Sequence, residues 1–369
     1  MEVVEVKNTH TTKVRVALER NGVAIDAGIP RTVCLKANWA EASTGDICER
    51  EARFYDLISG VPSLPVPSSF YADWDPGTGR GIVVMEDLVA APGEFGASAD
   101  DIGVDGVAAG LESLAKMHSS LWGDRRLDAT WMARSMGHSV DTEQVIQLWN
   151  YIEFNLTDPA YEAVLPAWVY ERPELLDHVL DELRAFELSR PGPHCLVHGD
   201  AHQGNSFLRA DGTRIWLDWQ LVRRGQPWRD VNYFMIGALG VEDRRVNDRE
   251  LFGHYHECLA GAVGHGVPSV DDAWAQFVRW TGYGTQAWLG NINLWGQDSG
   301  VEMVRRFFAA AEDYDTVALL TGGRRPRREI AIGEGAWPLT PTLRAALDAR
   351  TSHAVQQVAK PPAGGGRRR

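Results

Sequence analysis

Residues 196–208, LVHGDAHQGNSFL, place four polar side chains within eight positions, directly after a short apolar run. These side chains are His198, Asp200, His202 and Asn205. Imidazole, carboxylate and amide groups at this spacing suit a metal site, the surroundings of a nucleophile, or a loop for phosphoryl transfer. The rest of the chain bears on which of the three applies.

The composition is that of an ordinary globular protein. The chain has 369 residues, of which 44% are hydrophobic and 24% charged, and its formal net charge is −13. The length favours roughly two domains. The negative charge argues against nucleic acid or an anionic membrane surface as the main partner. The four cysteines lack CxxC spacing and are interpreted as reduced thiols.

No segment has the pattern of a targeting or membrane-spanning sequence. The N-terminus lacks a basic segment followed by an apolar stretch. The longest apolar-rich run, near 231–241, is far shorter than the ~20 residues that span a bilayer. We therefore expect no membrane span and a cytoplasmic location, and the oligomeric state stays open.

The first part of the chain combines strand patterns with one helix. The predicted strands are 13–20, 32–37 and 82–88. The second carries a single lysine, Lys36, near its end. Residues 46–59 have apolar side chains at helical spacing, and Glu51 lies on the apolar, inward face of that helix. This part is expected to be a small sheet lobe.

After a connector near 86–90, the chain becomes largely helical. The predicted helices are 105–122, 141–156, 173–188, 229–240, 246–263, 271–290 and 300–320. Two β-prone runs, 195–198 and 214–219, bracket the polar loop like a hairpin. Residues 341–358 are compatible with one more helix. The pattern predicts an α+β protein with a sheet lobe at 1–88, a helical lobe at 89–323, and a basic linker and disordered tail at 324–369.

A metallohydrolase is one hypothesis for the polar loop. His198, Asp200 and His202 supply metal-ligand types, and Asp218 adds another carboxylate. Alternate residues in a tight loop converge poorly on one ion, however, and no HExxH-type helix completes the site. A nucleophile is less favoured, because Ser206 lacks the GxSxG turn.

Phosphoryl transfer needs a cation for the nucleotide phosphates, a partner for that cation, magnesium ligands and a base. Lys36, Glu51, Asp200, Asn205 and Asp218 supply these groups in a workable order. A neutral amide at Asn205 suits a metal ligand beside a base, because a second carboxylate there would raise the pKa of Asp200.

Four motifs carry a resemblance to a known family. HGDAHQGN at 198–205 and LDWQ at 217–220 resemble the catalytic and metal loops of the aminoglycoside phosphotransferase and choline kinase group, within the protein-kinase-like fold. REARFYDLI at 50–58 and MEDL at 85–88 look closest to the ecdysteroid-kinase-like subset. The resemblance covers about residues 3–320. It implies two lobes, a small antiparallel-sheet N-lobe and a larger, mainly helical C-lobe.

The resemblance also implies an activity and residue roles. The activity is an ATP- and Mg²⁺-dependent kinase that moves the γ-phosphoryl group to a hydroxyl of a small molecule, with an aminoglycoside-, choline- or sterol-like acceptor unresolved. Asp200 would be the catalytic base, and Asn205 and Asp218 the Mg²⁺ ligands. Lys36 would hold the nucleotide phosphates, and Glu51 would hold Lys36.

Further residues have supporting roles by the same resemblance. The backbone of Glu86 and Leu88 would read the adenine edge, and His198 and Asp230 would brace the loop. His118, on an apolar helix face, is interpreted as a packed core histidine. Trp274, Trp280, Trp288 and Trp295 are interpreted mainly as core, with an aromatic acceptor pocket as the alternative.

The turn at 7–12, KNTHTT, departs from the family pattern because it contains no glycine. In this group the turn covers the phosphates with backbone N–H groups, and glycine allows that close approach. One explanation is that Thr and Asn side chains replace the missing backbone contacts to the phosphates. Another is that the start of the protein lies upstream of Met1. Because of this departure, a catalytically degenerate kinase-like module that binds nucleotide stays an alternative hypothesis.

Overall fold

The computed structural model describes residues 1–9, 11–39, 47–133, 152, 154–172, 174–190, 192–291 and 296–322. The chain divides into two compact units, residues 1–137 with 184–281 and residues 138–183 with 282–369. Within the described ranges, no helix is long and apolar enough to cross a membrane. The lobe boundaries predicted near residues 88 and 323 stay predictions.

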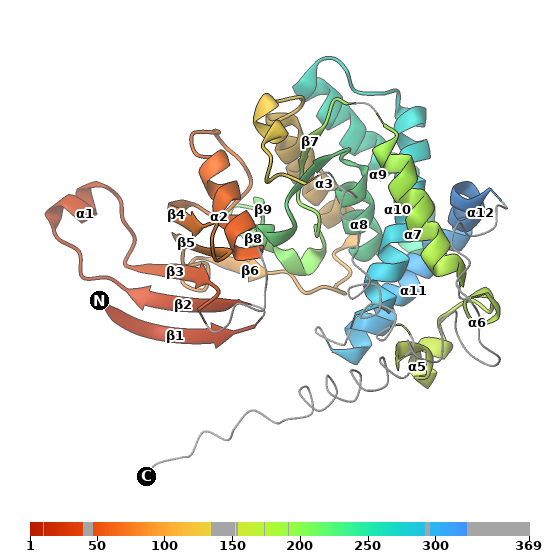
Figure 1. Ribbon diagram of the computed structural model, residues 1–369, viewed down its shortest axis with the longest axis horizontal. Helices are drawn as coiled ribbons and strands as arrows, with labels where there is room; N and C mark the ends of the chain where they lie inside the picture. The colour runs from red at the N-terminus through yellow and green to blue at the C-terminus, as the bar shows by residue number, and fades with distance from the viewer. Residues whose placement is uncertain are drawn as a thin grey trace, which may run out of the picture. The chain divides into compact units, whose positions relative to one another are not determined.

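Five antiparallel strands form the N-terminal sheet of the first unit, in the order β1-β2-β3-β5-β4 (Figure 1). They are β1 (Glu2–Asn8), β2 (Thr12–Ala17), β3 (Thr32–Ala37), β4 (Ser69–Asp75) and β5 (Arg80–Glu86). Helix α2 (Ile47–Leu57) packs against β4 and β5. Gly81 permits this close packing, because a Cβ there would lie 2.2 Å from the backbone oxygen of Cys48.

Two elements of this region differ from the prediction. Strand β4 was not predicted, because its polar residues and largely exposed side chains hide the apolar alternation that marks a strand. The short helix α1 (Gly22–Asp26), which follows Asn21, was not predicted either. The Asn21 side chain accepts a hydrogen bond from the backbone nitrogen of Ala24 at 2.9 Å, which is the geometry of a helix N-cap.

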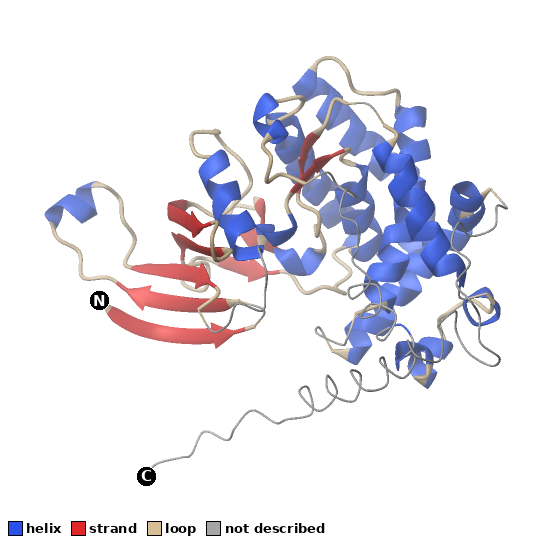
Figure 2. Cartoon of the chain, viewed as in Figure 1, coloured by secondary structure: helices blue, strands red, loops and turns tan. Residues whose placement is uncertain are grey.

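The remainder of the first unit is mostly helical (Figure 2). Its long helices are α3 (Gly103–Ser120), α8 (Trp228–Gly237), α9 (Val241–Val263) and the first part of α10 (Val270–Leu289), with η2 (Arg125–Asp128) as a short turn. Helix α3 packs on α8 and α9. At Gly110 a Cβ would lie 2.2 Å from the Phe234 ring, so glycine sets the α3–α8 approach. The expected α+β organisation is confirmed.

Two small sheets hold the polar loop. They are β6 (Gly93–Phe95), β8 (Ser206–Arg209) and β9 (Arg214–Trp216) in one, and β7 (Cys195–Val197) with β10 (Arg223–Gly225) in the other. The prediction that 195–198 and 214–219 bracket the loop as one hairpin was wrong. Strand β7 pairs with β10, and β9 pairs with β8. The loop therefore links two different sheets.

The second unit is helical in its described residues. Its elements are α5 (Pro159–Glu162), α6 (Trp168–Glu171), α11 (Gln297–Asp313), α12 (Thr316–Thr321), most of α7 (Glu174–Leu188) and the end of α10. The predicted helix 300–320 is interrupted at Asp315, whose φ is +51°. Most of 141–156, and all of 324–369 with its expected helix at 341–358, lie outside the described residues.

The described members of the tryptophan set at 274–295 are largely core residues, as expected. Trp280 and Trp288 are 2% and 1% exposed, which leaves little ring surface for an acceptor pocket. Trp274 is buried against Phe277, with a ring distance of 4.9 Å. Trp295 lies outside the described residues. The four cysteines are free thiols.

Candidate active site

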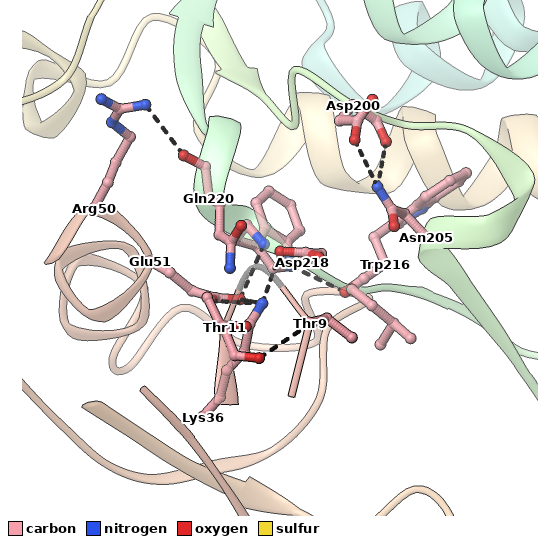
Figure 3. A network of polar contacts seen from close by, with 12 residues as sticks. Thr9, Thr11, Lys36, Arg50, Glu51, Asp200, Asn205, Trp216, Asp218 and Gln220 are labelled. Carbon is pink, nitrogen blue, oxygen red and sulfur yellow. Dashed lines mark hydrogen bonds and ion pairs between the residues drawn. The ribbon is translucent and has the colours of Figure 1, made fainter. Parts of the chain in front are cut away.

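The loop after β7 is held in one conformation by its own polar groups. The Asn205 Nδ2 atom donates to the Oδ2 atom and to the backbone oxygen of Asp200, at 2.9 and 3.0 Å (Figure 3). Asn205 ends the 3-10 turn η3 (Gln203–Asn205), and the His202 Nδ1 atom caps this turn by accepting from the Gly204 nitrogen at 3.1 Å. The Asp200 side chain is 30% exposed, so its carboxylate is accessible.

Gly199 is required by the path of this loop. Its φ is +87°, in the left-handed region, and a Cβ there would lie 2.2 Å from the Leu221 backbone oxygen. The backbone thus passes close to the residues after Asp218 only because residue 199 has no side chain.

A fully buried carboxylate, Asp230 of α8, anchors the start of the loop. It accepts from the backbone nitrogens of His198 and Gly199 at 2.6 and 3.0 Å. It also lies 3.3 Å from His118 Nε2. Burial alone would raise the pKa of Asp230, but His118 and, to a smaller extent, His198 and the Gly199 N–H group together outweigh it, so the pKa is lowered. The expectation of a packed His118 is confirmed, because its other ring nitrogen lies 2.8 Å from the Tyr255 hydroxyl.

Both ring nitrogens of His198 are hydrogen-bonded to backbone groups. Its Nε2 atom lies 2.7 Å from the Leu217 backbone oxygen, and its Nδ1 atom accepts from the Asp200 nitrogen at 3.2 Å. Nε2 therefore carries the proton, and neither nitrogen is available to a metal ion. The ring ties the Asp200 loop to the strand end before Asp218.

An ion-paired cluster brings together three of the predicted residues (Figure 3). The Lys36 Nζ atom of β3 lies 2.8 Å from Glu51 Oε2 of α2 and 2.7 Å from Asp218 Oδ1. Burial by itself would lower the pKa of Lys36, but the two carboxylates outweigh it, so the pKa is raised. Burial would likewise raise the pKa of Asp218, and Lys36 lowers it. Lys36 and Asp218 are therefore charged at neutral pH.

Helix α2 also contacts the residues after Asp218 through groups that sequence reasoning missed. The Phe54 ring stacks on Trp219 at 3.9 Å with an interplanar angle of 10°. The Trp219 nitrogen donates to Glu51 Oε1 at 3.1 Å, and Arg50 Nη1 donates to the Gln220 oxygen at 3.1 Å. The only signal in the sequence was Phe54, three residues after Glu51 on the same helix face.

Backbone geometry joins the ion-paired cluster to the loop. The Leu217 nitrogen donates to the Asn205 oxygen at 2.8 Å, which extends the β8–β9 pairing by one step. Asp218 follows directly and has φ +64° and ψ +66°. A non-glycine residue in this region is strained, and such strain clusters at functional sites. Among the described residues, no hydrogen bond joins Asp218 to Asp200 or Asn205.

The connector after β5 is fixed by two ion pairs. Arg15 of β2 holds Asp87 with two hydrogen bonds, at 2.9 and 3.0 Å. Arg209 of β8 forms a short ion pair with Glu86. The Leu88 side chain is buried with Phe207 and Ile215. The backbone of Glu86 and Leu88 is thereby held in place.

The donor set suits a cation that shares its ligands with phosphates. The amide nitrogen of Asn205 is engaged by Asp200, so its oxygen is the atom left for a cation. Asp218 supplies a carboxylate whose side chain is 35% exposed. One or two carboxylates with substrate oxygens are typical of Mg²⁺. In the part of the chain that the structure describes, no three His, Cys, Asp or Glu side chains are grouped so that they could hold a metal ion. The metallohydrolase is disfavoured by the His198 ring, because both of its nitrogens are hydrogen-bonded to the backbone.

Comparison with known proteins identifies the family of the chain. The sequence model of the phosphotransferase enzyme family, abbreviated APH, matches residues 40–263. The search of curated proteins gave no significant match.

Several solved structures are similar. A presumed aminoglycoside phosphotransferase from Ralstonia eutropha aligns at 17% identity and a TM-score of 0.50, over 85% of this chain and 92% of that chain. A choline/ethanolamine kinase family protein from Mesorhizobium loti aligns at 15% identity and 0.45, over 88% and 93%. Choline kinase from Streptococcus pneumoniae aligns at 12% identity and 0.47, over 85% and 95%. The first likeness concerns the fold, and it agrees with the predicted two-lobed, kinase-like α+β architecture.

Proposed function

Because the chain belongs to the phosphotransferase enzyme (APH) family, we propose that it is a small-molecule kinase that uses ATP and a divalent cation to phosphorylate a hydroxyl group. One observation carries the proposal. Lys36 lies within ion-pair distance of Glu51 and Asp218, at 2.8 and 2.7 Å, and backbone pairing connects Asp218 to the Asp200–Asn205 loop. These are the parts that phosphoryl transfer requires.

Asp200 is the proposed catalytic base. Asn205 holds its Oδ2 atom, which orients the carboxylate and leaves Oδ1 to accept the proton of an acceptor hydroxyl. The deprotonated oxygen then attacks the γ-phosphorus as the bond to the β-phosphate oxygen breaks. Positioning of this kind needs a fixed loop, and Asp230 and His198 supply the fixation.

Lys36 and Glu51 are proposed to act on the nucleotide phosphates. Glu51 keeps the ammonium in place at 2.8 Å, so that Lys36 meets a phosphate without reorganisation. A bound Mg²⁺ would neutralise phosphate charge, and the oxygens of Asn205 and Asp218 would hold it. The backbone of Glu86 and Leu88, on the fixed connector, would bind the adenine edge.

The decisive experiment replaces Asp200 with Asn, which keeps the size of the side chain and an oxygen for Asn205. We expect turnover to fall by about 10²- to 10⁴-fold while ATP affinity stays the same, because only the base is lost. Turnover is measured with the best acceptor from a panel of aminoglycosides, choline, sugars, sterols and macrolides. The exposed Asp26→Asn serves as the matched control. Unchanged turnover in Asp200→Asn would contradict the proposed mechanism.

A nucleotide-binding module without catalysis is the second candidate, and the glycine-free turn at 7–12 favours it. ATP with Mg²⁺ would then raise the melting temperature of the protein. No acceptor would be phosphorylated, and no slow ATP hydrolysis would be detected. Any Asp200-dependent turnover excludes this candidate.

A further inference from the structure

Three lysines form a row across the N-terminal sheet. Lys7 of β1 lies directly opposite Lys13 of β2, and Lys13 lies directly opposite Lys36 of β3. Residues opposite each other in antiparallel strands project from the same face of the sheet. The three ammonium groups therefore share the face from which Lys36 reaches Glu51 and Asp218.

This row is unusual for the chain. The sequence contains five lysines, and the other two are Lys116 and Lys360. Elsewhere the positive charge comes from arginine, so the concentration of lysine in three adjacent strands is not a consequence of composition. Lysine presents a compact charge that binds phosphate as a point contact.

The charges in the row are unevenly balanced. Lys36 is 5% exposed and has two carboxylate partners. Lys13 is half-buried, and in the described part of the chain its ammonium has no ion pair. Burial, and next to it the Lys36 charge, lower the pKa of Lys13, and the carboxylates of Asp218 and Glu51 offset this only in part. Like charges directly opposite in a sheet are destabilising, so the row suits an anion that is not part of the protein.

Two hydroxyl groups of the turn beside this row are engaged within the turn itself. The Thr12 hydroxyl donates to Asn8 Oδ1 at 2.9 Å, and the Thr9 hydroxyl donates to the Thr11 oxygen at 3.1 Å. The Thr9 and Thr12 hydroxyls are therefore already hydrogen-bonded inside the turn, and the substitution of glycine by Thr and Asn side chains stays a prediction. His10 lies outside the described residues.

We propose that Lys13, with Lys7 at the exposed end of the row, binds the phosphate chain of a nucleoside triphosphate beside Lys36. In this chain the two lysines take the part of the backbone amides of a glycine-containing turn. The assignment rests on the proposed function. It extends that function by naming two phosphate-binding residues that the motifs do not contain.

The test compares ligands that differ only in phosphate number. Binding of ATP, ADP, AMP and adenosine, with Mg²⁺, is measured by calorimetry for wild type, Lys13→Met, Lys7→Met and Lys13→Arg. Lys116→Met, an exposed lysine on α3, is the matched control. We expect Lys13→Met to weaken ATP binding by about 10-fold, with a smaller loss for ADP and none for adenosine. Lys7→Met should weaken ATP binding by roughly 2- to 3-fold, because Lys7 is exposed.

Two further readouts separate phosphate binding from a structural role. Lys13→Arg should retain most of the ATP affinity, because it keeps the charge. The unliganded melting temperature of Lys13→Met should stay the same or rise, because one member of a like-charge row is removed. A lysine that only supports the fold would lower the melting temperature when replaced.

The outcomes distinguish this inference from the proposed function. If wild type binds ATP and Lys13→Met binds it equally well, or loses adenosine and ATP affinity alike, the assignment of Lys13 is overturned and the kinase proposal stands. If wild type binds none of the four ligands, both are overturned.

Discussion

The loop at 198–205 pairs its polar groups within the protein, whereas the hairpin at 7–13 places two lysines opposite each other. In the loop, the buried Asp230 carboxylate accepts two backbone N–H groups, and both nitrogens of His198 are hydrogen-bonded. In the hairpin, all residues of β1 are exposed, and Lys7 lies opposite another lysine.

The difference indicates how stability and binding are distributed in this protein. A buried network whose members are all paired holds its geometry without a ligand. A row of like charges is less favourable in the free protein and gains most when an anion arrives. We infer that the loop is preorganised, and that the lysine charges of the hairpin are balanced only when the ligand binds.

The largest effect is expected from Asp230→Ala, which removes the buried carboxylate that anchors the loop at 198–205. Two buried backbone N–H groups lose their acceptor, so the free energy of unfolding should fall by about 3–5 kcal/mol, and turnover should fall with it. Urea unfolding measures the first quantity. The exposed Asp26→Ala is the control and should lie within about 0.5 kcal/mol of wild type. A loss below that level at Asp230 would remove the loop's proposed anchor.

A smaller effect is expected from Gly199→Ala. Its φ of +87° and the 2.2 Å contact of a Cβ with the Leu221 oxygen should reduce stability by about 1–3 kcal/mol. Gly22→Ala is the matched control, because Gly22 begins α1 and a Cβ there meets no atom within 4 Å. That variant should be neutral or more stable by about 0.4–1 kcal/mol. Equal behaviour of the two variants would mean that the loop tolerates rearrangement.

The smallest effect is expected on the hairpin. Thr12→Val removes the hydroxyl bonded to Asn8, and Asn8 then turns to water, so the loss in unfolding free energy should be about 0.5–1.5 kcal/mol. Thermal unfolding in the absence and presence of ATP measures it. A loss as large as that of Asp230→Ala would show that the hairpin is also preorganised, and would contradict the comparison.

Much of the fold and of the candidate site could be predicted from spacing along the chain. The helical position of Glu51, the strand position of Lys36 and the loop pair Asp200–Asn205 are local patterns, and the structure brings Lys36 to Glu51 and Asp200 to Asn205. The positions of Lys36 on a strand and Glu51 on a helix are confirmed, because strand and helix periodicity depend on neighbours in sequence, and the roles of these residues stay predictions.

Only the tertiary structure decided which distant elements meet. Nothing in the sequence indicated that β7 pairs with β10, that Phe54 stacks on Trp219, or that Lys7, Lys13 and Lys36 share one row. Strand register and ring packing arise from contacts between residues far apart in the chain, and a one-residue slip in register would move a lysine to the other face of the sheet. The sequence thus determined the chemical groups and their local geometry, and the strand pairing determined which charges share a site.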